Sequence, residues 1–395
     1  MGLDPQLIES PESLKHILAF EGQGLAAPNK LVHLIFRSSD NIRLVYGARN
    51  ISHFAWEFDV LNTDGLPHES ITQNQLHMLT LVDEVWTQCT YSKDVLTRHG
   101  VRNVHVVPTP VRFESDRPRL SREESLEALH EVIAAPLTLT TWLGRSEHMD
   151  LAAYGVSYLV RNPLLHASGR VFLIVCNPGD MRKNLLNSIE GFLMGSRPSD
   201  LLIVKLLIPN EGDYLFGGVY EKLSPLFHGP GCTSSNRVLF LLDYLSDAQM
   251  AALYALADFY LSAPHCEGYN LPLLEAMAVG TVPVSNRHTS MIDYIDDSNS
   301  VIIEHKSYTG LIKGMAGDIA RRTYAVAVSD RYQIAKAVQA ASTLSPSSYN
   351  DRSIASQERV MRAHSEKAIA VLLEARLTAP RTDLTLKVPR SCNCV

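Results

Sequence analysis

Short apolar runs alternate with amphipathic stretches along most of this chain. The apolar runs have the length expected of buried strands, and they lie at residues 31–36, 50–58, 103–111, 170–177, 201–209, 237–245 and 257–263. Stretches with helical periodicity lie between several of them, at 91–100, 183–195 and 246–257. Strands that alternate with helices at this spacing predict a parallel sheet with helices packed on it. We therefore expect an α/β protein.

The pattern becomes helical toward the C-terminus. Helical periodicity dominates residues 308–342 and 353–377, whereas 378–395 has no periodicity and is predicted to be disordered. The segment 112–166 is harder to interpret, although the second half of its charged stretch 112–132 predicts an exposed helix. A length of 395 residues suggests two domains.

Composition narrows the class of protein. Hydrophobic residues make up 46% of the chain and charged residues 20%, which is typical of a globular protein with a large core. The net charge of −6 argues against nucleic acid as the main partner. Local basic patches leave phosphate, or the anionic lipid of a membrane surface, open as partners. There is no apolar run of about 18 residues, so we expect no transmembrane helix.

The N-terminus is polar and acidic, which argues against a signal peptide. Cysteines at 89, 176, 232 and 266 are scattered, mostly in apolar contexts, as reduced core cysteines are, and show no metal-ligand spacing. A cytoplasmic location fits these cysteines best. The last four residues, CNCV, place a cysteine where a prenylation signal requires one, but Asn393 is not aliphatic, so lipidation is disfavoured.

The segment 265–284 carries the strongest local signal. Its sequence, HCEGYNLPLLEAMAVGTVPV, is flanked by apolar runs and predicts a turn, a short helix and a strand. Asn270 suits the N-cap, Pro272 is tolerated in a first helical turn, and Gly280 suits the position just past the helix. These signals limit the helix to about 8 residues.

Such a turn has a chemical use. A helix that opens at the end of a strand presents unpaired N–H groups and the positive end of its dipole, which suits a phosphate. Glu267 lies in the turn, and Glu275 lies about one turn into the helix. A carboxylate at Glu275 is suited to accept hydrogen bonds from both hydroxyls of a ribose. The segment therefore predicts a site for a nucleoside diphosphate with a further group attached.

Residues 267–280 resemble the donor-site signature of retaining glycosyltransferases of family 4. That signature has two glutamates separated by seven residues, a glycine after the first, and a closing Glu-Ala-Met-Ala-x-Gly. The resemblance implies the GT-B fold, in which two Rossmann-like domains face each other across a cleft and C-terminal helices brace the N-terminal domain. It implies donor contacts from Gly268, Tyr269, Asn270, Leu271 and Glu275, with Glu267 on the transferred sugar.

The same resemblance suggests domain limits. We expect an acceptor domain over 1–165, a donor domain over 166–305, C-terminal helices over 306–377 and a tail over 378–395. The family usually opens with a strand and a glycine-rich loop that approaches the donor phosphates. The nearest match, Gly22 and Gly24, is poor, so the N-terminal domain is expected to be shortened.

Residues 176–192 resemble the family segment that brings a basic residue to the donor diphosphate. By position, Lys183 matches the phosphate lysine, and the adjacent Arg182 substitutes for an arginine that many relatives carry earlier in the loop. Lys205, at a strand end, is a weaker candidate; a lysine that reaches toward solvent is the alternative. Two cations near a diphosphate would neutralise the leaving group without a metal. We therefore expect no metal or other cofactor.

The stretch 50–59 resembles the family's acceptor side. His53, Trp56 and Glu57 are candidates to line that side, although a buried, hydrogen-bonded histidine is the simpler interpretation of His53.

These patterns predict a retaining glycosyltransferase that moves a sugar from a nucleotide-diphosphate-sugar to a glycan or lipid-linked acceptor, in polysaccharide or glycoconjugate synthesis. A nucleotide-sugar epimerase shares the fold, but the two spaced glutamates argue against it. A non-catalytic subunit that binds nucleotide or glycan and partners an active enzyme stays open, because the N-terminal domain is short.

Overall fold

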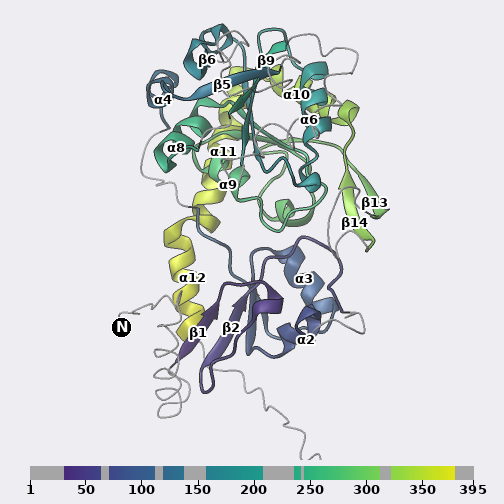
Figure 1. Cartoon of the computed structure of the whole chain (residues 1–395). Coiled ribbons are helices and arrows are strands. Elements are labelled where there is room, and N and C mark those ends of the chain that lie inside the picture. The colour runs from purple at the N-terminus through teal and green to yellow at the C-terminus, as the bar shows by residue number, and fades with distance from the viewer. Residues whose placement is uncertain are drawn as a thin grey trace, which may run out of the picture. The chain divides into compact units, whose positions relative to one another are not determined.

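The computed structural model describes residues 31–63, 71–111, 119–137, 157–207, 235–241, 244–311 and 322–378. These residues form two compact units (Figure 1). The first holds the described parts of Met1–Trp56, Val60–Pro108 and Ala370–Val395, and the second those of Glu57–Asp59 and Thr109–Ile369. The weak glycine match at 22–24, the cysteines at 232, 392 and 394, and the predicted disordered tail beyond 378 lie outside the described residues.

The first unit is built on a four-stranded sheet in the order β1-β2-β3-β4, with every pair parallel. Its strands are β1 (Val32–Ile35), β2 (Arg49–His53), β3 (Glu84–Thr87) and β4 (Val104–Val106). Its helical elements are η1 (Ser39–Asn41), η2 (Ile71–Gln73), α2 (Gln75–Thr80) and α3 (Thr90–Arg98). Each parallel pair needs a crossover, and the chain supplies one after each strand.

The C-terminal helix α12 (Glu366–Thr378) completes the first unit. Its side chains at Leu372, Leu373 and Leu377 pack against a buried cluster on the sheet. Arg49 of β2 forms an ion pair with Glu84 of β3 and donates a hydrogen bond to the carbonyl oxygen of Arg376 at 3.1 Å. The last helix therefore braces the N-terminal sheet, as the sequence predicts.

The second unit is built on an eight-stranded sheet in the order β12-β11-β10-β7-β8-β9-β5-β6. The run from β12 to β9 is parallel, and β5 and β6 add antiparallel strands at one edge. The strands are β5 (Ile133–Leu137), β6 (Ser157–Tyr158), β7 (Val171–Cys176), β8 (Leu201–Leu206), β9 (Ser235–Leu241), β10 (Phe259–Ser262), β11 (Val282–Ser285) and β12 (Val301–Ile302).

Helices cover both faces of this sheet (Figure 1). They are α4 (Arg122–Ala128), η4 (Leu159–Arg161), η5 (Pro163–His166), η6 (Met181–Lys183), α6 (Leu185–Gly195), α8 (Asp247–Leu256), α9 (Leu271–Ala278), η7 (Thr289–Asp293), α10 (Arg331–Ser342) and α11 (Pro346–His364). Within the described ranges, no helix is both long and apolar enough to cross a membrane.

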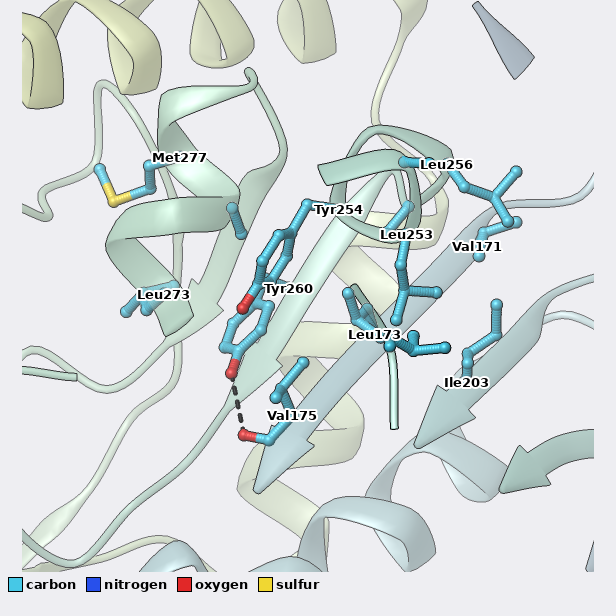
Figure 2. Close-up of a cluster of buried hydrophobic side chains, with 14 of the residues drawn as sticks. Val171, Leu173, Val175, Ile203, Leu253, Tyr254, Leu256, Tyr260, Leu273 and Met277 are labelled. Carbon is cyan, nitrogen blue, oxygen red and sulfur yellow. Dashed lines mark hydrogen bonds between the residues drawn. The ribbon is translucent and has the colours of Figure 1, made fainter. Parts of the chain in front are cut away.

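The core of the second unit has two halves because strand side chains alternate between the faces of the sheet. In β7, Val171, Leu173 and Val175 join the cluster under α8 and α9, whereas the residues between them join the cluster under α6 and α10. Figure 2 shows the first cluster, with β7 and β8 side chains meeting those of α8 and α9. Strands buried on both faces explain the near-continuous apolar runs in the sequence.

Two predicted boundaries differ from the structure. The N-terminal domain was expected to extend to 165, but the first unit's main segment ends at Pro108. The reason is that β5 pairs antiparallel with β9, so the chain from Thr109 onward builds the second sheet. Residues 306–377 were expected to be helical, but β13 (Lys306–Gly310) and β14 (Tyr324–Val328) form an antiparallel hairpin there. Tyrosine, threonine and valine favour a strand at these positions.

Candidate functional site

Two adjacent strands, β7 and β10, position the predicted site. They are parallel neighbours, with Phe259 opposite Phe172, so the loops that follow them leave the same edge of the sheet. The loops touch directly, because the backbone N–H of His265 donates to the carbonyl oxygen of Arg182 at 2.7 Å. Residues about 80 positions apart in the chain thus meet at the edge where ligands bind in open α/β sheets.

Each loop leads into a helix through an asparagine in the left-handed region. Asn184 before α6 has φ 54°, and Asn270 before α9 has φ 59°. Asparagine tolerates this conformation better than most residues. Neither asparagine side chain caps its helix: that of Asn270 donates to Ser262 Oγ at 3.2 Å, and that of Asn184 to the Ser329 carbonyl at 2.8 Å. Asn270 therefore occupies the predicted N-cap position, but its side chain does not cap the helix.

The helix of the signature has the predicted extent. α9 begins at Leu271, the predicted donor contact that lies partly buried against the core, and spans 8 residues. Gly280 follows it with φ 83°, which confirms the glycine predicted just past the helix. Gly268 is buried in the turn before α9. These local features set where Glu267 and Glu275 stand relative to the start of the helix.

Lys183 and Glu267 meet in an ion pair at this edge. Lys183 ends η6, and Glu267 is only 5% exposed. The backbone of Glu267 is fixed by η7, because its N–H donates to Thr289 Oγ1 at 2.9 Å and its carbonyl accepts from Ser290 at 3.3 Å. Two of the predicted catalytic residues are thus brought together.

Arg182 is held by two other carboxylates. Its Nε and Nη2 donate to the two oxygens of Asp180 at 3.0 and 2.7 Å, and Nη1 pairs with Glu57. Burial would lower the pKa of Arg182, but the charges of Glu57 and Asp180 outweigh it and raise the pKa. Arg182 therefore stays positively charged. Sequence reasoning did not find Asp180, and it placed Glu57 on the acceptor side, whereas the structure joins Glu57 to the second unit.

Glu275 projects from α9 and is partly buried. Its Oε2 accepts a hydrogen bond from the hydroxyl of Tyr254, in α8, at 2.8 Å. Burial, with the nearby Tyr260 and Glu275, raises the pKa of Tyr254 well above its ordinary value. The phenol therefore stays protonated and is the donor of this hydrogen bond. Tyr254 was not predicted, because a tyrosine on an apolar helix gives no sequence signal of a partner 21 residues away.

The side chain of Tyr269 is held by hydrogen bonds within the second unit. Its hydroxyl donates to the carbonyl of Thr109 at 2.6 Å and lies 2.8 Å from Nδ1 of His364. Because the hydroxyl has one proton to give, we assign the proton of this second bond to Nδ1. The backbone carbonyl of Tyr269 accepts a hydrogen bond from the hydroxyl of Tyr294 at 2.8 Å. The signature turn is thereby tied to the segments at 109–111 and 364–365, where Val111 and Ser365 form a bridge.

Protonation of His364 makes the free energy of unfolding depend on pH. Burial, assisted by Arg359, lowers the pKa of His364 to about 4, below the ordinary value of 6.5. Below pH 6.5 the unfolded chain therefore binds a proton that the folded chain does not bind until about pH 4. From His364 alone, the free energy of unfolding should fall by about 2 kcal/mol between pH 6.5 and about 5.

Urea unfolding of wild type and of His364→Asn, at several pH values, tests this contribution. Asparagine keeps an N–H near the position of Nδ1 but does not titrate, so its stability should fall less steeply with acidity. His130→Asn, at a histidine whose side chain is 66% exposed, is the control and should follow wild type. If the free energy of unfolding fell equally with acidity in wild type and in His364→Asn, the lowered pKa of His364 would be contradicted.

The remaining predicted residues make other contacts. Lys205 is 4% exposed in β8 and its Nζ donates to the Leu206 carbonyl at 2.8 Å, so it is not a lysine that reaches toward solvent. His53 donates a hydrogen bond from Nε2 to the Val107 carbonyl oxygen at 3.1 Å, and burial lowers its pKa. Trp56 donates to the Val60 carbonyl at 2.9 Å. His53 and Trp56 belong to the first unit.

Among the residues that the structure describes, no group of three or more histidine, cysteine, aspartate or glutamate side chains is arranged to hold a metal ion. The cations that the site offers are those of Lys183 and Arg182. Cys89, Cys176 and Cys266 are buried, and none of the three is in a disulfide.

The chain is similar to known proteins in sequence and in fold. Residues 234–317, which hold Glu267 and Glu275, match the family model described as "Glycosyl transferases group 1". A search of curated proteins finds no match. Sucrose-phosphate synthase from Thermosynechococcus elongatus has a similar structure, with a TM-score of 0.58 and 14% identity over 94% of this chain and 80% of that one.

Two further structures are similar. HepE from Anabaena, in complex with UDP and glucose, has a TM-score of 0.55 and 13% identity over 84% of this chain and 72% of that one. TarM from S. aureus, as a variant in complex with Fondaparinux, alpha-GlcNAc-glycerol and UDP, has a TM-score of 0.50 and 10% identity over 85% of this chain. This chain spans 52% of the TarM chain. The fold is GT-B, as the sequence predicts, and together with the family model these likenesses support a glycosyltransferase.

Proposed function

We propose that this protein is a retaining glycosyltransferase of the family 4 type, which moves a sugar from a nucleotide-diphosphate-sugar to a glycan or lipid-linked acceptor. One observation carries the proposal. Lys183 and Glu267 meet at the carboxyl ends of two neighbouring parallel strands, and Glu267 lies in the turn that leads into α9. A cation, a carboxylate and a helix N-terminus at one edge are what a sugar diphosphate requires.

Each residue then has a role in the transfer. Glu275 accepts hydrogen bonds from the ribose hydroxyls, while the start of α9, with Lys183 and Arg182, binds the diphosphate. Glu267 binds a hydroxyl of the transferred sugar and orients the ring. The leaving phosphate oxygen takes the proton of the acceptor hydroxyl, and we assign no side chain as a covalent nucleophile. This differs from the carboxylate pair of typical glycoside hydrolases.

The ion pair between Lys183 and Glu267 links binding of the diphosphate to binding of the sugar. A diphosphate that reaches Lys183 competes with Glu267 for its ammonium group. Glu267 is then available to accept a hydrogen bond from the sugar that the same diphosphate carries. Phosphate binding would thereby prepare the carboxylate for the sugar, and the whole donor would bind better than its nucleotide alone.

The proposal needs no metal or other cofactor, because Lys183 and Arg182 supply positive charge for the leaving diphosphate. The acceptor class and a role in polysaccharide or glycoconjugate synthesis are part of the proposal; the likeness to HepE, solved with UDP and glucose, supports a nucleotide-sugar donor. We further propose a cytoplasmic location, peripheral at the inner face of a membrane where the acceptor is lipid-linked. Cys89, Cys176 and Cys266 form no disulfide, which fits a reducing compartment.

Calorimetric titration with UDP, GDP, ADP and dTDP, each with and without chelator, tests the donor site. We expect one of them to bind with a dissociation constant in the micromolar range, about −8 kcal/mol, and with the same affinity in chelator. Slow hydrolysis of the matching nucleotide-sugar should follow. Loss of binding in chelator would overturn metal independence. If none of the nucleotides binds, the donor site is absent; if one binds but its nucleotide-sugars are never turned over, the protein is a non-catalytic GT-B subunit.

A further inference from the structure

Packing alone does not explain why the buried side chain of Tyr254 carries a hydroxyl group. The tyrosine belongs to α8 and is 0% exposed, inside the core cluster shared by α8, α9, β7 and β10. Figure 2 shows its ring beside that of Tyr260. A phenylalanine would fill this space equally well, and a buried hydroxyl costs free energy unless it finds a hydrogen-bond partner.

The partner of that hydroxyl is Glu275. The distance from Tyr254 Oη to Glu275 Oε2 is 2.8 Å. Since the phenol donates, Glu275 accepts, and the bond is strongest when the carboxylate is ionised. The core residue thus favours one orientation of the Glu275 carboxylate.

The tyrosine itself is rigidly placed. Its carbonyl accepts a hydrogen bond from Thr281 Oγ1 at 2.6 Å, and its ring centre lies 6.3 Å from that of Tyr260. Glutamate, in contrast, is flexible, and fixing its side chain costs conformational entropy. Because the hydroxyl is fixed, its hydrogen bond orders the Glu275 side chain when the protein folds. That side chain then loses less entropy when a ligand binds, which is the usual benefit of preorganisation.

We propose that Tyr254 is a positioning residue, which holds the carboxylate of Glu275 in the orientation that binds the ribose of the nucleotide. The inference rests on the proposed function, because it assigns a role to Tyr254 within the same donor site. It predicts that Tyr254 affects the ribose contact and leaves the diphosphate contact unchanged.

The chain offers a matched control in Tyr260. Its hydroxyl is also buried in this cluster, but it donates to the Val175 carbonyl at 3.1 Å, the bond drawn in Figure 2. Tyr254→Phe and Tyr260→Phe therefore each remove one buried hydroxyl from the same core. Both should lower the melting temperature slightly, and only Tyr254→Phe should weaken binding of the nucleoside diphosphate that wild type prefers, by about tenfold.

Two further titrations separate positioning from a general structural effect. Pyrophosphate, which has no ribose, should bind wild type and Tyr254→Phe equally. Tyr254→Phe combined with Glu275→Ala should bind the nucleotide no more weakly than Glu275→Ala alone, because Tyr254 acts through Glu275.

The outcomes are distinct. If wild type binds a nucleotide and Tyr254→Phe binds it as Tyr260→Phe does, the positioning role is wrong and the donor site stands. If Tyr254→Phe weakens pyrophosphate and nucleotide alike, its effect is structural and the role is again wrong. If wild type binds no nucleotide at all, the proposed function fails and this inference fails with it.

Discussion

Replacement of Lys183 with alanine is expected to lower donor turnover by about 10²–10³-fold. In the proposed reaction, its ammonium group stabilises negative charge that develops on the departing diphosphate, an interaction that is stronger in the transition state than in the ground state. The loss should therefore appear mainly in kcat. Steady-state hydrolysis of the nucleotide-sugar, followed as nucleotide release, measures it.

The control for this variant is Lys336→Ala. Lys336 also pairs with a glutamate, Glu304, at 2.8 Å, but both side chains are about two-thirds exposed or more. Its removal should change neither turnover nor stability measurably. Lys183→Ala, in contrast, leaves Glu267 buried without that cation, so some loss of stability is expected.

A double variant separates the two effects. Lys183→Ala with Glu267→Gln removes both charges and should recover the melting temperature without recovering turnover. Turnover of Lys183→Ala within about threefold of wild type, a difference below 1 kcal/mol, would exclude the leaving-group role. Turnover that returned with stability in the double variant would show that Lys183 matters only for folding.

Local sequence signals predicted the elements that carry the site. The helix at 271–278 and the glycine in the left-handed region at 280 both follow from short-range chemistry, and the structure confirms each. Asn270 shows the limit of such signals. Asparagine favours both N-caps and left-handed turns, and the sequence does not say which property is used.

Contacts between distant residues escaped prediction. Glu57 pairs with Arg182 across 125 residues, and Tyr254 finds Glu275 only because α8 and α9 pack on the same face of the sheet. Likewise, β5 reaches the second sheet by pairing with β9, about 100 positions later. Such pairings depend on the three-dimensional arrangement, and an isolated apolar or charged residue does not reveal its partner.

Glu275→Ala is expected to weaken nucleotide binding at least about tenfold, because each hydrogen bond from a ribose hydroxyl to a carboxylate contributes about 1.5–3 kcal/mol. Calorimetric titration with the preferred nucleoside diphosphate and with its 2′-deoxy form measures the effect. Wild type should prefer the ribose form, whereas the variant should bind both forms with similar, weaker affinity. Pyrophosphate should bind wild type and variant alike, since it makes no contact with Glu275.

Glu275→Gln distinguishes ribose binding from support of the core. Glutamine retains an oxygen that accepts the hydrogen bond of Tyr254, so its melting temperature should stay near that of wild type, yet it has lost the charge that strengthens the ribose contacts. It should therefore bind nucleotide more weakly than wild type and more tightly than Glu275→Ala. Glu190→Ala, at a partly exposed glutamate of α6 paired with Arg331, should bind as wild type does. Unchanged affinity in Glu275→Ala would remove Glu275 from the donor site and leave its bond to Tyr254 as a structural contact.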